Sequence, residues 1–257
     1  MVKKCAIDAK GSGWRYAVLS VRDRNRGRIA AFCEEEKMTK AAPKKQTRSR
    51  DPERTKAQLT EAALLEFADH GFHGARVDRI TKAVGCNPRL LYHYFGSKEK
   101  LYVAVIEHIF ADIRAQERDL EMARLAPLDA MRRLVEFTYD FFDSNPLFVK
   151  MTRNENLLEG RFIAQTDAVR TSSQPLIDAI CGAMERGLAE GVFRHRYDPL
   201  QIYITIVALS AHHLNNGHTL TAIFGVDLLS PAWRQERRAH TVALVLNSLT
   251  GGDSPLT

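Results

Sequence analysis

Polar and aromatic side chains gather in the segment from Asp78 to Lys98, which reads DRITKAVGCNPRLLYHYFGSK. Arginine can donate two hydrogen bonds to the edge of a guanine base, and tyrosine, lysine and arginine side chains can bind phosphates. A helix with such groups on its outer face has the chemistry needed to enter the major groove of duplex DNA. The residues that we expect to contact DNA are Arg76, Arg89, Leu90, Tyr92, Tyr94 and Lys98.

The segment is expected to fold as two short helices joined by a tight turn. Gly85 suits the positive φ that a chain needs when it reverses between packed helices. Asn87 can cap the second helix, and Pro88 fits its first position. Leu91 and Phe95 lie four residues apart and would anchor that helix inward, which leaves the arginine and the tyrosines on its outer faces.

A preceding helix from about Pro52 to His70 would support this unit. Its apolar face is expected to include Phe67 and His70, and Gly71 should end it. The helix over residues 77–84 is expected to turn Val77, Ile80, Ala83 and Val84 inward. Residues 51–97 are therefore predicted to form a three-helix bundle with a helix-turn-helix.

The charge distribution favours a polyanionic partner. The chain carries 37 Lys and Arg against 31 Asp and Glu, a net charge of +6. Residues 1–98 hold 21 of the basic and 11 of the acidic residues, so the front part is basic and the remainder is acidic. On charge alone, a basic disordered tail without a partner would also explain this balance.

Both ends of the chain are expected to be disordered, because residues 1–50 and 251–257 lack lasting apolar periodicity. We expect Met38 to be the natural start of the protein. The cluster of Lys44, Lys45, Arg48 and Arg50 could reach phosphates or a minor groove, or it could be a solvated tail.

Residues 98–250 read as a series of helices. The fourth helix should end by about Arg124, and a long helix from Arg161 to Glu190 should be interrupted near Pro175. The segment LQIYITIVALSAHHLNN is apolar nearly all round, which indicates burial on two sides. It could lie at the centre of a monomer, or pack with the last helix in a homodimer. The expected dimer residues are Tyr203, Val207, Ala211, Ala239, Val242, Ala243 and Leu246.

Other classes of protein are disfavoured. No G-x-S-x-G, H-E-x-x-H, P-loop or glycine-rich dinucleotide turn is present, so we expect no enzyme and no cofactor. The four cysteines are scattered, and His212 and His213 are adjacent in sequence, so we expect no metal site. No run of about 18 apolar residues and no secretory signal is found, so we expect a cytoplasmic protein without a membrane span.

The block LTEAALLEFADHGFHGARVDRITKAVGCNPRLLYHYFGSKEKLYVAVIE resembles the DNA-binding domain of TetR-family transcriptional regulators. The resemblance implies an all-α fold, in which a helical ligand-binding and dimerisation domain over residues 98–250 follows the helix-turn-helix. It also implies a repressor that binds an inverted-repeat operator as a dimer and is released by a small-molecule effector. Arg76 departs from the pattern, since family members often have Ser or Thr at that position as a cap and phosphate contact.

The segments NPLFVKMTRNENLLEGRFI and RGLAEGVFRHRYDPLQIYITIVALSAHHLNNGHTLTAIFG are similar to regulators of the pyrimidine-utilisation type within that family. This similarity implies an effector cavity among the fourth to eighth helices and a pyrimidine-like ligand. Candidate lining residues are Phe142, Phe148, Met151, Asn154, Glu155, Tyr203 and His212. Each of these could instead be a plain core or bracing residue, and a helical architectural or scaffold DNA-binding protein without an effector is the alternative function.

Overall fold

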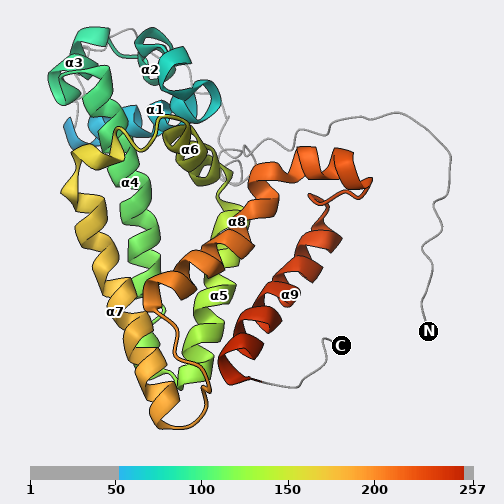
Figure 1. Cartoon of the computed structure of the whole chain (residues 1–257). Coiled ribbons are helices and arrows are strands. Elements are labelled where there is room, and N and C mark those ends of the chain that lie inside the picture. Colours follow the sequence, from blue (N-terminus) through green and yellow to red (C-terminus); the bar gives the residue numbers. More distant parts are fainter. Residues whose placement is uncertain (1–51, 252–257) are drawn as a thin grey trace, which may run out of the picture. The chain divides into compact units, whose positions relative to one another are not determined.

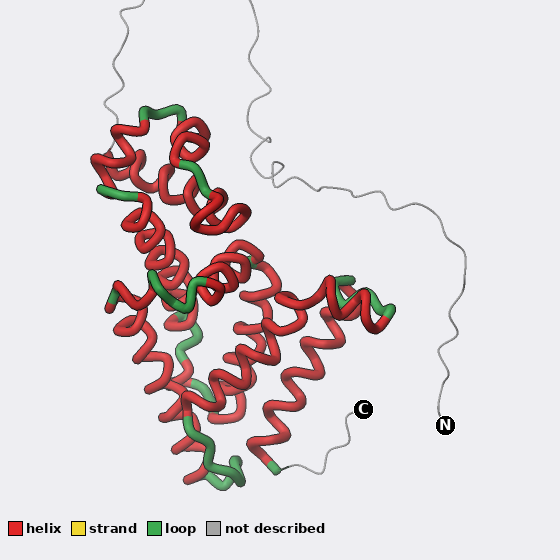
Figure 2. The backbone as a smooth tube through the Cα atoms, turned by 45° about the horizontal axis from the view of Figure 1, so that its top comes forward, coloured by secondary structure: helices red, strands yellow, loops and turns green. Residues whose placement is uncertain are grey.

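The computed structural model describes residues 52–251 of the chain. This part is helical throughout and contains no strand, as Figure 2 shows, so the predicted all-α class is confirmed. The expectations for residues 1–50, for the start at Met38 and for the tail beyond Gly251 lie outside the described residues. No helix among residues 52–251 is long and apolar enough to cross a membrane.

The three helices of the predicted DNA-binding unit are α1 (Pro52–Gly74), α2 (Val77–Val84) and α3 (Pro88–Phe95). They pack on one end of α4 (Lys98–Arg118), as Figure 1 shows. The remaining elements are η1 (Met122–Arg124), α5 (Pro127–Ser144), α6 (Pro146–Leu157), η2 (Ile163–Gln165), α7 (Asp167–Ala189), α8 (Pro199–Phe224) and α9 (Pro231–Thr250).

The helices of the DNA-binding unit lie where they were expected, except that α1 extends past His70 to Gly74, and two residues of the expected inward face are exposed. Gly71 has a φ of 63° and interrupts α1, after which the chain makes one more helical turn to Gly74. Gly85 has a φ of 71°, and the side chain of Asn87 accepts a hydrogen bond of 2.9 Å from the backbone N–H of Arg89. His70 and Ala83 are exposed instead of inward.

The inward residues of this unit form one apolar cluster. Leu59 and Phe67 of α1, Ile80 of α2 and Leu91 of α3 are each no more than 1% exposed. The same cluster continues into α4 through Tyr102, whose ring meets that of Phe67 edge-on at 4.8 Å. The DNA-binding unit and α4 therefore share a core, and α4 holds the unit against the rest of the chain.

Two helix boundaries in the C-terminal part differ from the expectation. α4 ends at Arg118, because the backbone turns at Glu121 with a φ of 47° and enters the short helix η1. α7 begins only at Asp167 and runs without a break through Pro175. Proline removes one helix hydrogen bond, and the burial of Leu176 and Ile180 in the second core holds the helix together across that position.

Within residues 52–251, α8 is buried on one face only, so it is not a helix at the centre of a monomer, and burial of its other side by a partner stays a prediction. Ile202 and Ile206 enter the core beside α5 and α9, whereas Leu200 and Ile204 are about half exposed, at 51% and 52%. α8 packs on α5, α7 and α9, and α9 packs on α5. The exposed side of α8 is thus an apolar surface that no other part of residues 52–251 covers.

Candidate DNA-binding surface and effector cavities

The outer face of α3 presents the predicted DNA-contacting residues. Arg89 is exposed, Tyr92 is 47% exposed, and Leu90 and Tyr94 are half-buried. Leu91 and Phe95 hold the opposite face in the core. The guanidinium group of Arg89 and the phenol of Tyr92 are therefore exposed to solvent, while the packing of the opposite face fixes the orientation of the helix.

The N-terminus of α2 is held by a carboxylate that the sequence did not indicate. Arg76 has no side-chain cap, but its backbone N–H donates a hydrogen bond of 2.8 Å to Glu66 on α1. Arg79 donates to the same oxygen at 2.7 Å and also to the carbonyl oxygen of Gly74. Burial alone would raise the pKa of Glu66, but the bonds from Arg79 and Arg76 outweigh it and lower that pKa. The side chain of Arg76 remains exposed.

Lys98 is turned toward the protein. Its Nζ donates a hydrogen bond of 2.6 Å to the carbonyl oxygen of Ala75 and lies 4.9 Å from the centre of the Phe72 ring. Burial lowers the pKa of this lysine. An ammonium group has three donors, so Lys98 braces the turn before α2 and keeps donors for a phosphate.

α6 is bonded directly to α1. The side-chain nitrogen of Asn154 donates to the carbonyl oxygen of Phe67 at 2.9 Å, and Lys150 pairs with Asp69 at 2.6 Å. Asn154 was expected to orient a ligand, and the structure instead shows its amide bonded to the backbone of the DNA-binding unit. This pairing was not predictable from spacing, because the two residues lie 87 positions apart.

A cavity of about 200 Å³ lies between α4 and α6, next to these contacts. It brings together two of the predicted ligand residues, Met151 and Glu155. Phe148 and Phe142 meet edge-on in an aromatic cluster with centroids 5.7 Å apart, outside the cavity lining. The lining residues are Ile106, Ile109, Phe110, Met151, Thr152, Glu155, Asn156, Gly160 and Ile163.

Glu155 is the charged group of this cavity. Its Oε1 accepts hydrogen bonds from the backbone N–H groups of Phe162 and Ile163 at 2.7 and 2.8 Å. Its Oε2 is buried and makes no hydrogen bond of good geometry among the described residues, although the buried hydroxyl of Tyr102 is close enough to interact with this carboxylate. The pKa of Tyr102 is raised by burial and by the neighbouring Glu155 carboxylate. A ligand N–H that entered the cavity could satisfy Oε2.

A second cavity, of about 280 Å³, lies between the end of α4, η1 and α7. The predicted residue Tyr203 does not line it but bonds to two residues that do. Its hydroxyl accepts a hydrogen bond of 3.0 Å from Arg114 and donates one of 3.4 Å to Glu117. Arg114 and Glu117 were missed at the sequence level. The available signal was that residue 117 continues the apolar series of Ile106 and Ile113 on the inward face of α4.

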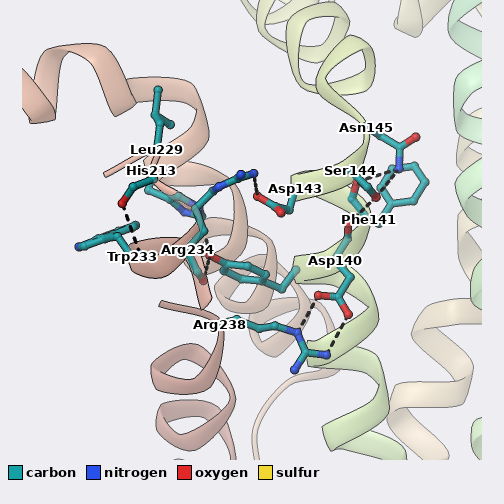
Figure 3. A network of polar contacts seen from close by, with 12 residues as sticks. Asp140, Phe141, Asp143, Ser144, Asn145, His213, Leu229, Trp233, Arg234 and Arg238 are labelled. Atoms are coloured by element: carbon teal, nitrogen blue, oxygen red, sulfur yellow. Dashed lines mark hydrogen bonds and ion pairs between the residues drawn. The ribbon is translucent and has the colours of Figure 1, made fainter. Parts of the chain in front are cut away.

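His212 is exposed and lines neither cavity, and its neighbour His213 is the buried residue. Figure 3 shows His213 and Trp233 beside the ion pair of Arg234 with Asp143. The Tyr139 ring stacks on His213 with centroids 5.4 Å apart, and burial lowers the pKa of His213 to about 4. These contacts tie α8 and α9 to α5, and the expected ligand role of His212 stays a prediction.

The predicted dimer residues divide into three groups by exposure. Ala211, Val242 and Leu246 are buried inside the chain, and Tyr203, Val207 and Ala243 are half-buried. Only Ala239 is exposed. The exposed apolar side chains on these two helices include Ile204 at 52% and Leu244 at 41%. The three buried side chains offer little surface to a partner, so Ile204 and Leu244 are added as candidate contacts, and the predicted dimer residues stay a prediction.

Known proteins resemble the chain over both parts. Residues 59–105 match the description "bacterial regulatory proteins, tetR family", and residues 127–245 match the tetracyclin repressor-like C-terminal domain. The HTH-type transcriptional repressor NicS of Pseudomonas putida is 34% identical over 181 residues, which are 70% of this chain and 85% of NicS. The HTH-type transcriptional regulator RutR of Escherichia coli is 28% identical over 190 residues, 70% of this chain and 84% of RutR.

A crystal structure of the putative transcriptional regulator SCO4942 from Streptomyces coelicolor has a TM-score of 0.56 at 25% identity. The likeness covers 76% of this chain and 98% of that one. The resemblance expected from the helix-turn-helix segment is therefore confirmed. The chain belongs to the tetR family of bacterial regulatory proteins and is a helix-turn-helix transcriptional regulator.

Proposed function

We propose that the protein is a dimeric repressor that binds an inverted-repeat operator and leaves it when a small molecule occupies the cavity between α4 and α6. The observation that carries this proposal is the hydrogen bond from Asn154 to Phe67, which joins the helix beside the cavity to α1. The repressor NicS, with its similar sequence, supports the sign of regulation. The protein would act in the cytoplasm, where it meets chromosomal DNA.

The exposed side chains of α3 support base reading in the major groove. Arg89 would donate to a guanine edge, while Tyr92, Tyr94, Arg76 and Lys98 would contact phosphates, and Leu90 would touch a thymine methyl. Most of the affinity would come from the phosphate contacts and would fall with rising salt concentration.

The uncovered apolar surface on α8 and α9 supports a homodimer. Pairing of Ile204 and Leu244 with their counterparts in a second chain would bury side chains that are otherwise about half exposed. A two-fold dimer would place two α3 helices roughly 34–36 Å apart, one turn of B-DNA, and would therefore select an inverted repeat.

The effector would act by shifting the population of two conformations. A ligand that binds one position of α6 more tightly favours the matching position of α1, and hence a spacing of the two α3 helices that fits the operator less well. By linkage, the operator and the effector would weaken each other by the same factor.

A single planar ring with N–H donors, such as a pyrimidine, suits the cavity. The volume of about 200 Å³ is small, and its walls from α4 are apolar. Oε2 of Glu155 would accept a ring N–H. The amide of Asn156 has two N–H donors and uses one on the carbonyl oxygen of Thr152, so the other could donate to a ring carbonyl group.

The proposal is tested by selecting a binding site from random DNA and then titrating the complex with uracil and other pyrimidines. Selection should return an inverted repeat, and a fluorescence anisotropy assay should show release by at least one compound. Purines serve as controls, and comparing them with the pyrimidines would establish which kind of ring is recognised. Recovery of DNA without sequence preference, together with no release by any compound, would support the architectural alternative.

A further inference from the structure

The cavity between α4 and α7 has one charged end and one apolar wall. Arg114 and Glu117 of α4 line it with side chains only 6% and 2% exposed. Met122 and Leu176 supply buried apolar surface on the other side. A volume of about 280 Å³ gives room for a small organic molecule. This cavity is distinct from the one beside α6, since no lining residue is shared.

The charged end has more hydrogen-bond donors than acceptors. Arg114 pairs with Glu117 at 2.7 Å and donates to Tyr203 at 3.0 Å. A guanidinium group has five N–H donors, and the buried Nε of Arg114 has no acceptor among the residues that the structure describes. An unsatisfied buried donor is costly, so an acceptor that entered the cavity would be stabilised there.

The mouth of the cavity adds positive charge. Arg118 is exposed beside it, and Arg124 pairs with Glu121 at 2.7 Å. Three arginines and two glutamates therefore line the cavity, which favours an anion. The partial negative charge at the C-terminal end of α4 opposes an anion by a smaller amount, since it corresponds to only about half an elementary charge.

We propose that this cavity binds a small organic monocarboxylate, with the carboxylate on Arg114 and the apolar part of the molecule against Met122 and Leu176. Arginine matches the planar geometry of a carboxylate better than any other side chain, because its N–H groups form a fork. The site goes beyond the proposed effector cavity. It lies at the opposite end of α4, the helix that carries the DNA-binding unit at its first residues.

The test is calorimetric titration of the full chain, without DNA, with butyrate and benzoate at neutral pH. Butyramide and benzamide serve as neutral probes of the same shape. At least one acid should bind saturably with one site per chain, and its amide should bind roughly tenfold to a hundredfold more weakly, as expected for the loss of a charged hydrogen bond. Because DNA and pyrimidines are absent, the result is independent of the proposed effector cavity.

Two variants test whether the measured heat of binding comes from this cavity. Arg114→Gln should abolish carboxylate binding, and Ala179→Leu should do so by filling the cavity while every charge is kept. Ala179→Leu decides the question if Arg114→Gln fails to fold. Arg170→Gln is the matched control, since Arg170 is exposed on α7 and pairs only with Asp167 among the described residues.

Three outcomes would overturn the proposal. If the acid and its amide bound with equal affinity, Arg114 would not be the group that binds the carboxylate. Tighter binding of butylammonium than of butyrate would make Glu117 the anchor and the site a cation site. If neither acid gives a saturable binding isotherm at millimolar concentration, the cavity does not bind small monocarboxylates.

Discussion

Nδ2 of Asn154 on α6 donates a hydrogen bond of 2.9 Å to the carbonyl oxygen of Phe67 on α1. Phe67 is fully buried at the centre of the DNA-binding unit, and Met151 and Glu155, which flank Asn154 on α6, line a cavity. The exposed pair of Lys150 with Asp69 runs beside this bond. A displacement of α6 by a ligand would therefore reach α1 through one partly buried bond and one solvated ion pair.

Asn154→Ala should weaken the link between effector and operator while both ligands still bind. The carbonyl oxygen of Phe67 would lose its side-chain donor, and α6 could move without displacing α1. We expect the effector-induced loss of operator affinity to shrink by about 1 kcal/mol, roughly fivefold. Operator affinity is measured by anisotropy with and without saturating effector.

Lys150→Ala is the matched control for this experiment. Its ion pair with Asp69 is exposed on both sides, and such pairs contribute little. The variant should respond to the effector like the original protein. A response of Asn154→Ala equal to that of Lys150→Ala would contradict the proposed route.

Arg89→Ala should relax the sequence preference of the protein. If the guanidinium group reads a guanine, its loss removes discrimination of roughly 1–3 kcal/mol at one base position of each half-site. Selection from random DNA, repeated with the variant, measures this directly. Lys98→Ala is the comparison, since a lost phosphate contact weakens all sequences alike. An unchanged selected site for Arg89→Ala would exclude Arg89 as a base reader.

Glu66→Gln should lower the stability of the DNA-binding unit, because the carboxylate of Glu66 accepts hydrogen bonds from both Arg76 and Arg79. The pKa of Glu66 is lowered in the folded protein, so its contribution to stability is present above the unfolded pKa of about 4.5 and is lost as pH falls through the folded value. Thermal unfolding at pH 7 should shift down by a few degrees. At pH 3 the two proteins should differ less, and an equal shift at both pH values would contradict this account.

Glu117→Gln should flatten the dependence of stability on pH between about 5 and 8. Burial raises the pKa of Glu117 to about 7, with Arg114, Tyr203 and Arg118 nearby lowering it in part. A raised pKa means that the folded state holds the proton longer, so the stability of the original protein falls as pH rises from about 4.5 through 7. The fall amounts to on the order of 3 kcal/mol.

Denaturant unfolding of both proteins at pH 5, 6, 7 and 8 measures this slope. Glutamine keeps an oxygen that can accept from Arg114 but does not titrate. α7 lines this cavity with Ser172, Pro175, Leu176 and Ala179, none of which titrates. Parallel curves for the two proteins would assign the pH dependence to other groups.

The helix-turn-helix was predictable because its determinants are local. Gly85, Asn87 and Pro88 fix the turn through backbone conformation and capping, and Leu91 and Phe95 fix the orientation of α3 by their spacing. Both signals lie within a few residues of the structure that they specify.

The contacts that join distant segments were not predictable in this way. Glu66 is 10 residues from the N–H group that it holds, Asn154 is 87 from Phe67, and Arg114 is 89 from Tyr203. Apolar periodicity indicates that a face is buried, but it does not indicate whether the same chain or a partner buries it. This is why Val242 and Leu246 were assigned to a dimer and are found in the core of the chain.

Ile204→Glu should separate the dimer into folded monomers. Ile204 is 52% exposed on α8, so a charge there leaves the core of the chain intact and meets its counterpart across the proposed two-fold axis. Sedimentation velocity should show half the mass, and circular dichroism should show unchanged helix content. Leu157→Glu is the control, because Leu157 is 77% exposed on α6. Each monomer would bind one half-site and would lack the salt-dependent phosphate contacts that the second subunit makes to the other half-site. Operator affinity should therefore fall when the dimer dissociates. A variant that stays dimeric would move the interface away from this face of α8.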